Sequence, residues 1–226
     1  MDNVETFQVA CATPAQRTEL LRPARSIAYA LGMDRLSKQL TFLLEIDKLK
    51  TIARQTLISD GSRREGDAEH CWHVSMFAMV LAEYGPPGLD LARTIRMLLV
   101  HDLVEIDAGD TYCYDASAVA TQNDREAQAA RRIFSLLPAD QGDEIRALWE
   151  EFEARQTPEA KFAAALDRVQ PVLLNYHTQG RAWQEHNISR AQVIARCGHI
   201  AQGSAQLWEY IGAMIEDSVG KGYLRP

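Results

Sequence analysis

Apolar residues recur at helical intervals along most of the chain, and almost nowhere do they alternate with a period of two. Between Ser37 and about Ile58, residues such as Leu40, Leu43 and Leu44 roughly keep a period of about 3.6 residues. This pattern predicts a long helix there and, over the whole chain, an all-α fold without a sheet.

Further helices are expected over residues 68–84 and 90–105, the first ending at the sequence GPPG, which cannot continue a helix. Three later start signals are the capping-box pairs Asn123 with Glu126 and Ser189 with Gln192, and the N-cap Thr157 before Pro158. Pro171 is expected to kink the helix that this last signal opens.

These elements predict one compact bundle of about seven to nine helices over residues 36–226. Residues 1–35 have a mixed pattern and are interpreted as an N-terminal extension packed on that core.

Composition narrows the possible partners. The chain has 226 residues, 46% of them hydrophobic, and 31 acidic against 24 basic residues give a net charge of −7. This balance argues against binding to a nucleic-acid polymer, which needs a basic face. No run approaches the ~20 apolar residues that span a bilayer, and the N-terminus shows no signal pattern. The four cysteines form no CxxC pair, so a soluble cytoplasmic protein is expected.

Candidate chemistry begins with His101 and Asp102, which follow the apolar run MLLV. A lone buried histidine is usually satisfied by a backbone carbonyl, but a buried carboxylate costs several kcal/mol unless it meets a cation, a metal or a donor. Imidazole and carboxylate together are common ligands of divalent metals. His70 heads the preceding predicted helix, and antiparallel packing of neighbouring helices could bring it close to His101.

Three segments carry a resemblance to a known family: AEHCWHVSMFAMVLAEY, then RMLLVHDLVEIDAGD, then EAKFAAALDRVQPVLLNY. In this order and spacing they resemble the HD-domain metal-dependent phosphohydrolases, and most nearly the small HD-domain 5′-deoxynucleotidases. The resemblance covers roughly residues 37–220. It implies one divalent metal ion (Mn²⁺, Co²⁺, Mg²⁺, Zn²⁺ or Fe²⁺) with the ligands His70, His101, Asp102 and Asp167.

The same resemblance implies three residues that act on the substrate. Arg54 matches an arginine that orients phosphate, and Asp110 matches a catalytic acid that contacts the substrate. Glu105 stands four residues after His101, so on a helix it would share that face and could orient a water molecule or accept its proton.

Other interpretations of these residues stay open. His73, one turn after His70, could be a ligand instead, although packing or a hydrogen bond to a ligand is the simpler role. Asp167 could pair with Arg168 or Arg131 on a partly wet surface, and Arg54 could be an ordinary surface arginine.

Two departures from the family pattern matter. Gln55 follows Arg54 where the bacterial deoxynucleotidases have a tryptophan that helps exclude a ribose 2′-hydroxyl, which leaves the sugar preference open. No histidine lies between Asp102 and Asp167, whereas the two-metal HD proteins carry extra histidine ligands in that interval. The expectation is therefore a single-metal hydrolase.

The resemblance implies hydrolysis of a small phosphomonoester, in particular a (deoxy)nucleoside 5′-monophosphate. The alternatives are an HD-domain enzyme of another class, either an iron oxygenase or a hydrolase of other phosphoesters, and a non-catalytic metal-stabilised regulatory module. A homodimer is also implied, and residues 204–219 form an amphipathic helix that could pair two copies or belong to the core.

Overall fold

The computed structural model describes residues 33–110, 114 and 121–226. Residues 1–32, most of the predicted N-terminal extension, lie outside this part of the chain. Eight of the described α-helices have at least eight residues: α3 (Asp34–Ile46), α4 (Asp67–Leu81), α5 (Leu91–Val100), α8 (Gln122–Phe134), α9 (Ala139–Ala154), α10 (Pro158–His177), α12 (Arg190–Cys197) and α14 (Ala205–Gly220). The shorter helices are α6 (Glu105–Ala108), α11 (Arg181–Glu185) and α13 (Ile200–Gly203). The predicted all-α class is confirmed.

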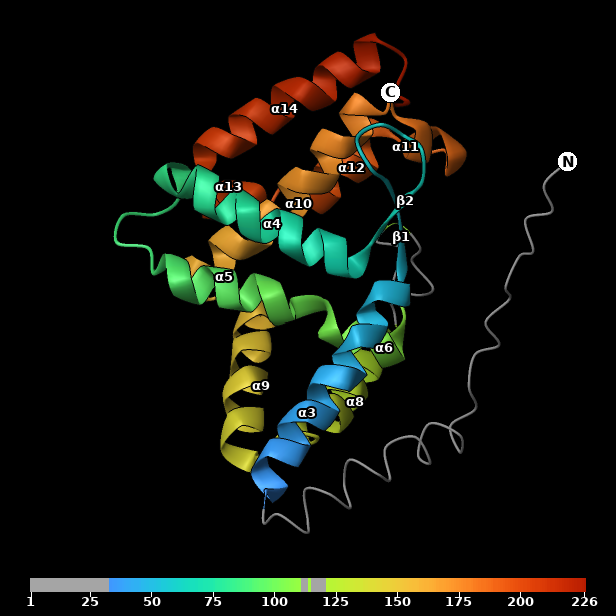
Figure 1. The fold of residues 1–226 in the computed structure, drawn as a ribbon. Helices are drawn as coiled ribbons and strands as arrows, with labels where there is room; N and C mark the ends of the chain where they lie inside the picture. The colour runs from blue at the N-terminus through green and yellow to red at the C-terminus, as the bar shows by residue number, and fades with distance from the viewer. Residues whose placement is uncertain (1–32, 111–113, 115–120) are drawn as a thin grey trace, which may run out of the picture.

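A small hairpin interrupts the region in which one long helix was predicted. After α3 the chain makes a 3₁₀ turn over Asp47–Thr51 and then forms β1 (Ala53–Leu57), which pairs antiparallel with β2 (Arg64–Gly66). The predictions of a helix as far as residue 58 and of no sheet were therefore wrong. The hairpin leads directly into α4 (Figure 1). The Gly66 N–H donates to the Glu69 carboxylate at 3.1 Å, and this bond satisfies a backbone donor that the helix start would otherwise leave free.

The helix α10 forms the centre of the larger hydrophobic core. It begins as predicted, since Thr157 Oγ1 accepts from the Ala160 N–H at 3.2 Å and Pro158 occupies the first turn. Phe162 and Leu166 are fully buried along it, and Pro171 lies inside the helix. The helices α4, α5, α9, α13 and α14 all pack against α10.

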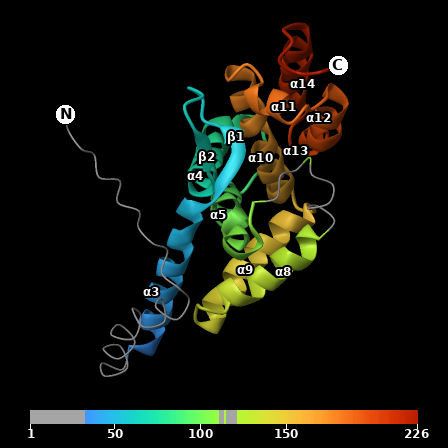
Figure 2. The ribbon, with the colours of Figure 1, turned by 90° about the vertical axis from the view of Figure 1, so that its right-hand side faces the viewer.

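The molecule has two hydrophobic cores. The first surrounds α10, and the second lies among α3, α8, α9 and the 3₁₀ turn His101–Val104, with Ile133 and Phe134 buried in it. Figure 1 shows α14 at one end of the molecule and α3, α8 and α9 at the other, and Figure 2 shows α8 and α9 side by side. The helix α4 contributes Cys71 to the second core and Val74 to the first, so residues near its start lie where the two cores meet.

The remaining start signals gave mixed results. The Ser189–Gln192 capping box is confirmed at the start of α12. The Asn123–Glu126 box is wrong: α8 begins at Gln122, its N-cap Thr121 makes no side-chain cap, and the Gln122 amide donates to Glu126 at 2.6 Å. The helix over 68–84 ends as predicted before GPPG, with a last 3₁₀ turn at Ala82–Tyr84.

The helix α14 covers one side of the larger core. Leu207, Ile211 and Ile215 are buried, and α14 packs against α10 and α13. This supports the core alternative for its apolar face. Among the described helices, none combines the length and the apolar character that a membrane span requires.

Candidate metal and phosphate site

The four residues expected to hold a metal come together from three helical segments. His70 lies in the first turns of α4, His101 and Asp102 lie in the 3₁₀ turn after α5, and Asp167 lies in α10. His70 Nε2 is 3.0 Å from Asp167 Oδ1, and His101 Nε2 is 3.2 Å from Asp102 Oδ1. His101 Nε2 lies 3.7 Å from Asp167 Oδ1, and His70 Nε2 lies 3.9 Å from Asp102 Oδ2.

Two ligand atoms at about 2.1 Å from one ion are about 3.0–3.4 Å apart when the angle between them is near 90–109°. The two shorter separations lie in this range, and the two longer ones, 3.7 and 3.9 Å, correspond to wider angles at the ion. All four side chains are buried, and His101 Nε2 has no hydrogen-bond partner among the described residues. An unsatisfied buried nitrogen beside two carboxylates is a suitable electron-pair donor to a borderline metal ion.

The protonation of His101 is set by the backbone. Its Nδ1–H donates to the Leu98 carbonyl at 2.9 Å, so Nε2 carries the free electron pair that faces the carboxylates. Burial opposes a charge on this ring, but Asp102 first, and then Cys71 and Asp167, outweigh burial and raise the pKa of His101 well above its ordinary value. The carboxylates thus create a strong demand for positive charge at this point, which a proton or a metal ion can meet.

Asp167 has two kinds of positively charged neighbour. Its Oδ1 faces the two histidines, while its Oδ2 lies 3.3 Å from an Arg168 nitrogen, so the alternative pairing with Arg168 coexists with the cluster. Although burial alone would raise the pKa of the carboxyl, Arg168, His101 and His70 hold it well below the usual range. Asp167 is therefore an ionised group, as a metal ligand must be.

Arg54 enters the site from strand β1 and not from the predicted helix. Its Nη1 donates to Asp102 Oδ2 at 3.1 Å and lies 3.4 Å from Asp67 Oδ1. Its side chain is only 11% exposed, which rules out the ordinary surface arginine. Burial opposes the guanidinium charge, but Asp102, Asp167 and other carboxylates raise the pKa of Arg54 well above its ordinary value.

Glu105 and Asp110 lie on one side of the same pocket. Residues 101–104 form a tighter 3₁₀ turn, so the α-helical spacing expected between His101 and Glu105 is not realised. The carboxylate oxygens of Glu105, Asp110 and Asp67 instead lie within 4.8 Å of one another. Burial, and then repulsion from Asp102, raise the pKa of Glu105 well above its usual range and also raise the pKa of Asp110.

The pocket that joins these groups has a volume of about 240 Å³. Arg54, Asp102, Glu105 and Asp110 line it, together with polar and aromatic side chains such as Glu126 and Trp183. Gln55, also in the lining, has its side-chain oxygen 3.2 Å from His186 Nε2. The pocket therefore places a cation, acids and an aromatic ring around one cavity.

His73 and Asp107, two titratable residues in the same segments as the predicted ligands, have other surroundings. His73 lies outside the metal cluster, with Nδ1 3.1 Å from Gln170 Nε2. Asp107 lies in α6 and forms an ion pair with Arg132. Neither contributes to the cluster of His70, His101 and Asp167.

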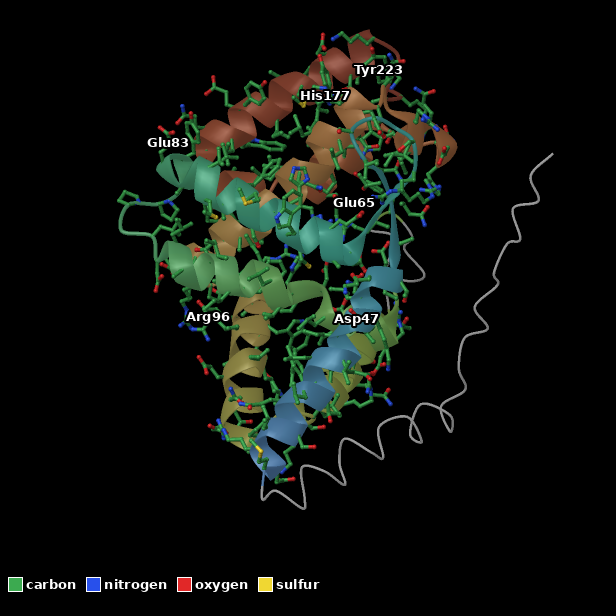
Figure 3. The ribbon with its side chains drawn as sticks, viewed as in Figure 1. Asp47, Glu65, Glu83, Arg96, His177 and Tyr223 are labelled. Carbon is green, nitrogen blue, oxygen red and sulfur yellow. The ribbon has the colours of Figure 1, made fainter. Side chains whose placement is uncertain are left out.

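Three buried polar residues near the site were not predicted: Glu65, Asp67 and Gln170. Asp67 accepts from Arg54, and Gln170 contacts both His70 and Glu65. Figure 3 shows Glu65 near the start of α4, at the end of that helix opposite Glu83. Burial opposes its charge, but His70, His73 and Arg54 lower the pKa of Glu65 to about 2. The sequence signal for Gln170 was its position three residues after Asp167, on the same face of a helix.

Comparison with known proteins adds a family and relatives. The model of the HD domain family matches residues 46–208. The human 5′-deoxynucleotidase HDDC2 is 33% identical over 135 residues, which cover 59% of this chain and 65% of that protein. The Schizosaccharomyces pombe 5′-deoxynucleotidase hdd1 is 25% identical over 154 residues, which cover 66% of this chain and 76% of that protein. The chain thus spans slightly less than two thirds of the length of its human relative.

Two solved structures are similar in fold. A predicted metal-dependent phosphohydrolase from Magnetospirillum magnetotacticum MS-1 is 50% identical, with a TM-score of 0.83 over 86% of this chain and 98% of that one. The PH0347 protein from Pyrococcus horikoshii OT3 is 18% identical, with a TM-score of 0.56 over 80% of this chain and 99% of that one, a likeness of fold alone.

Proposed function

This chain belongs to the HD domain family, and from that premise we propose that it is a metal-dependent phosphomonoester hydrolase acting on (deoxy)nucleoside 5′-monophosphates. The observation that carries the proposal is the position of Arg54. A guanidinium buried within 3.1 Å of the proposed metal ligand Asp102 puts a phosphate-binding cation beside the metal site. The relatives named 5′-deoxynucleotidase support the nucleotide substrate.

The residues His70, His101, Asp102 and Asp167 would hold one divalent ion. When bound, such an ion polarises a phosphoryl group and lowers the pKa of a water molecule, so that hydrolysis can proceed at neutral pH. Mn²⁺, Co²⁺, Mg²⁺, Zn²⁺ and Fe²⁺ all accept nitrogen and oxygen ligands, so these four residues suit each of the five ions.

Three residues of this chain act on the substrate in the proposed reaction. Arg54 binds the phosphate oxygens and sets the orientation of the phosphorus atom. Glu105 orients the water whose oxygen bonds to phosphorus as the bond from phosphorus to the 5′-oxygen breaks. Asp110, whose pKa burial raises, can hold the proton that the leaving oxygen requires, and it lines the pocket that would receive the sugar.

Phosphate release tests the proposal. Metal-stripped protein would be assayed with ribo- and deoxyribonucleoside 5′-monophosphates after Mg²⁺, Mn²⁺, Co²⁺ or Zn²⁺ is restored singly. We expect release that depends on the metal and falls strongly in an Arg54→Met variant, mainly through a higher KM. Release that continues at full rate without any metal would contradict the proposal, and oxygen consumption with Fe²⁺ would favour the oxygenase instead.

We also propose that the protein is a cytoplasmic homodimer. An exposed apolar face on α4 supports the homodimer, since Trp72, Met79 and Val80 are 63%, 55% and 67% exposed. Light scattering on the eluting protein measures the mass directly. A monomeric mass at micromolar concentration would remove this part of the proposal and leave the hydrolase activity unaffected.

A further inference from the structure

Gln170 is a fully buried polar side chain in the middle of α10. It follows Asp167 by three residues, which places the two side chains on the same face of the helix. Its Oε1 lies 3.2 Å from His70 Nδ1, while its Nε2 lies 3.1 Å from His73 Nδ1 and also donates to Glu65 Oε1. Each polar atom of Gln170 therefore has a partner on α4 or just before it.

These contacts fix which way the Gln170 amide points. Glu65 is a carboxylate that faces Arg54 Nε at 3.6 Å, so it can only accept hydrogen bonds. The NH₂ end of Gln170 must therefore face Glu65, and the oxygen end must face His70. An oxygen at that position requires a hydrogen on His70 Nδ1, which leaves the electron pair on Nε2, the atom 3.0 Å from Asp167 Oδ1.

Glu65 connects this arrangement to Arg54. One carboxylate oxygen accepts from Gln170, and the other lies 3.6 Å from both Arg54 Nε and His70 Nδ1. The residue sits in β2, which pairs with the strand that carries Arg54. The buried Glu65 carboxylate therefore contacts Gln170, which holds the proposed metal ligand His70, and it also contacts Arg54, the guanidinium proposed to bind phosphate.

The two histidines of the site are oriented in different ways. His101 Nδ1–H donates to a backbone carbonyl, which no side-chain substitution removes, whereas His70 depends on the side chains of Gln170 and Glu65. Side chains that fix the tautomer of a metal-binding histidine contribute strongly to metal affinity.

We propose that Gln170 and Glu65 are positioning residues: Gln170 holds His70 with Nε2 toward the metal site, and Glu65 anchors both Gln170 and Arg54. This inference rests on the proposed metal and phosphate site. It predicts different effects for the two residues. Loss of Gln170 affects metal binding alone, whereas loss of the Glu65 charge affects both metal binding and phosphate binding.

Direct titration with Co²⁺ tests the inference without an activity assay. Metal-stripped wild type, Gln170→Met and Glu65→Gln would be titrated by calorimetry, and the visible absorption of bound Co²⁺ would report its coordination. We expect Gln170→Met to raise the Kd for Co²⁺ by about 10- to 100-fold, as loss of an outer hydrogen bond to a ligand does elsewhere. Glu65→Gln should also raise it.

Binding of inorganic phosphate to the Co²⁺-loaded proteins, at saturating Co²⁺, separates the two roles. Glu65→Gln should weaken phosphate binding by about tenfold or more, because Arg54 loses a charged partner that fixes its orientation. Gln170→Met should leave the Kd for phosphate within about threefold of wild type, because Glu65 remains in contact with Arg54.

Thr178→Val is the matched control. Thr178 is a buried polar residue just after the end of α10, and its hydroxyl donates to the Leu174 carbonyl at 2.9 Å, away from the site. Like the other two substitutions, its removal takes a buried hydrogen bond away and should lower the stability of the metal-free protein, but it should not change the Kd for Co²⁺.

A Kd for Co²⁺ in Gln170→Met within about threefold of wild type would overturn the inference. If Gln170→Met does not fold, the Kd of the shape-conserving Glu65→Gln decides in the same way. A wild-type protein that binds no Co²⁺ would overturn the proposed function itself, so the two failures are distinguishable.

Discussion

The Asp102 carboxylate is in contact with both His101 and Arg54, so one side chain links the proposed metal site to the proposed phosphate site. In Asp102→Asn the amide keeps the shape but loses the charge that attracts the cation. We expect metal affinity and phosphate release to fall by more than about 100-fold, a larger loss than when a side chain that only hydrogen-bonds to a ligand is removed. Calorimetry and a phosphate assay measure the two losses, and circular dichroism should show an unchanged helical fold.

Asp107→Asn is the control for this substitution. Asp107 lies five positions later and pairs with Arg132 outside the pocket lining. It should bind metal and release phosphate as wild type does. Equal losses in the two variants would mean that a general charge effect, and not the contacts of Asp102, is responsible.

Gln55 stands at the position where the resemblance suggested control of the sugar. It lines the pocket beside Arg54 and contacts His186. An indole ring in place of the Gln55 amide would therefore narrow the space next to the phosphate site. We expect Gln55→Trp to raise the ratio of kcat/KM for deoxyribo- over ribonucleotides by about tenfold, since a steric clash with the 2′-hydroxyl affects only the ribo substrate. An unchanged ratio would place sugar selection elsewhere.

Residues that act directly at the site were easier to predict than the residues that support them. His101 and Asp102 stood out because a charged pair directly follows an apolar run, and burial of such a pair requires a partner. Glu65 and Asp67 precede a helix among turn-forming residues, where acids are common, and Gln170 carries no charge at all. Their roles come from contacts between segments about 100 residues apart, as for Gln170 and His70.

At the scale of the secondary-structure elements, α13 packs with its backbone close to that of α10. A Cβ on Gly203 would lie 2.4 Å from the Lys161 carbonyl oxygen and 2.7 Å from the Ala165 Cβ. Gly203→Ala must therefore push α13 away from the central helix, and we expect the free energy of unfolding to fall by about 1–3 kcal/mol. Urea denaturation measures the change.

Gly212→Ala in α14 is the comparison for this effect. A Cβ there would meet nothing within 4 Å, so only the helix propensity of alanine changes. The variant should be more stable than wild type by about 0.5–1 kcal/mol. Two glycine-to-alanine changes of opposite sign would show that the cost in α13 comes from packing.

Sequence periodicity predicted the long helices well and the hairpin poorly. The helix from 158 to 177 starts at a cap that local chemistry determines, and the helix from 67 to 81 is a long apolar segment that ends before GPPG. The strands have only five and three residues. Leu49 and Ile52 before β1 and Leu57 at its end continue an approximately helical spacing of apolar residues from α3 into this strand. Pairing of β1 with the neighbouring strand β2 decided the outcome, and the spacing of apolar residues within one short segment does not reveal that pairing.

At the scale of the whole molecule, stability should depend on the buried acids around the pocket. Burial raises the pKa of Glu126 to about 7 from an ordinary value of 4.5. Between these pH values the folded protein keeps a proton that the unfolded chain has released. The contribution of Glu126 to the free energy of unfolding therefore decreases as pH rises from about 4.5 to about 7.

Glu126→Gln tests this dependence, because glutamine resembles the protonated acid at every pH. In the metal-free protein we expect the variant to exceed wild type by about 1–3 kcal/mol at pH 8 and to match it near pH 4. Urea denaturation at both pH values gives the comparison. A difference that does not change with pH would assign the effect to packing.

The position of the site between two hydrophobic cores has a consequence for the chain as a polymer. His70 and Asp167 are separated by 97 residues, and His101 and Asp102 come from a third segment between them. An ion held by all four would act as a removable cross-link that closes large loops, as a disulfide does, and would restrict the unfolded chain wherever it stayed bound. Removing the ion would release the two cores from this tether, and opening of one core would then be coupled to opening of the other only through shared helices such as α4.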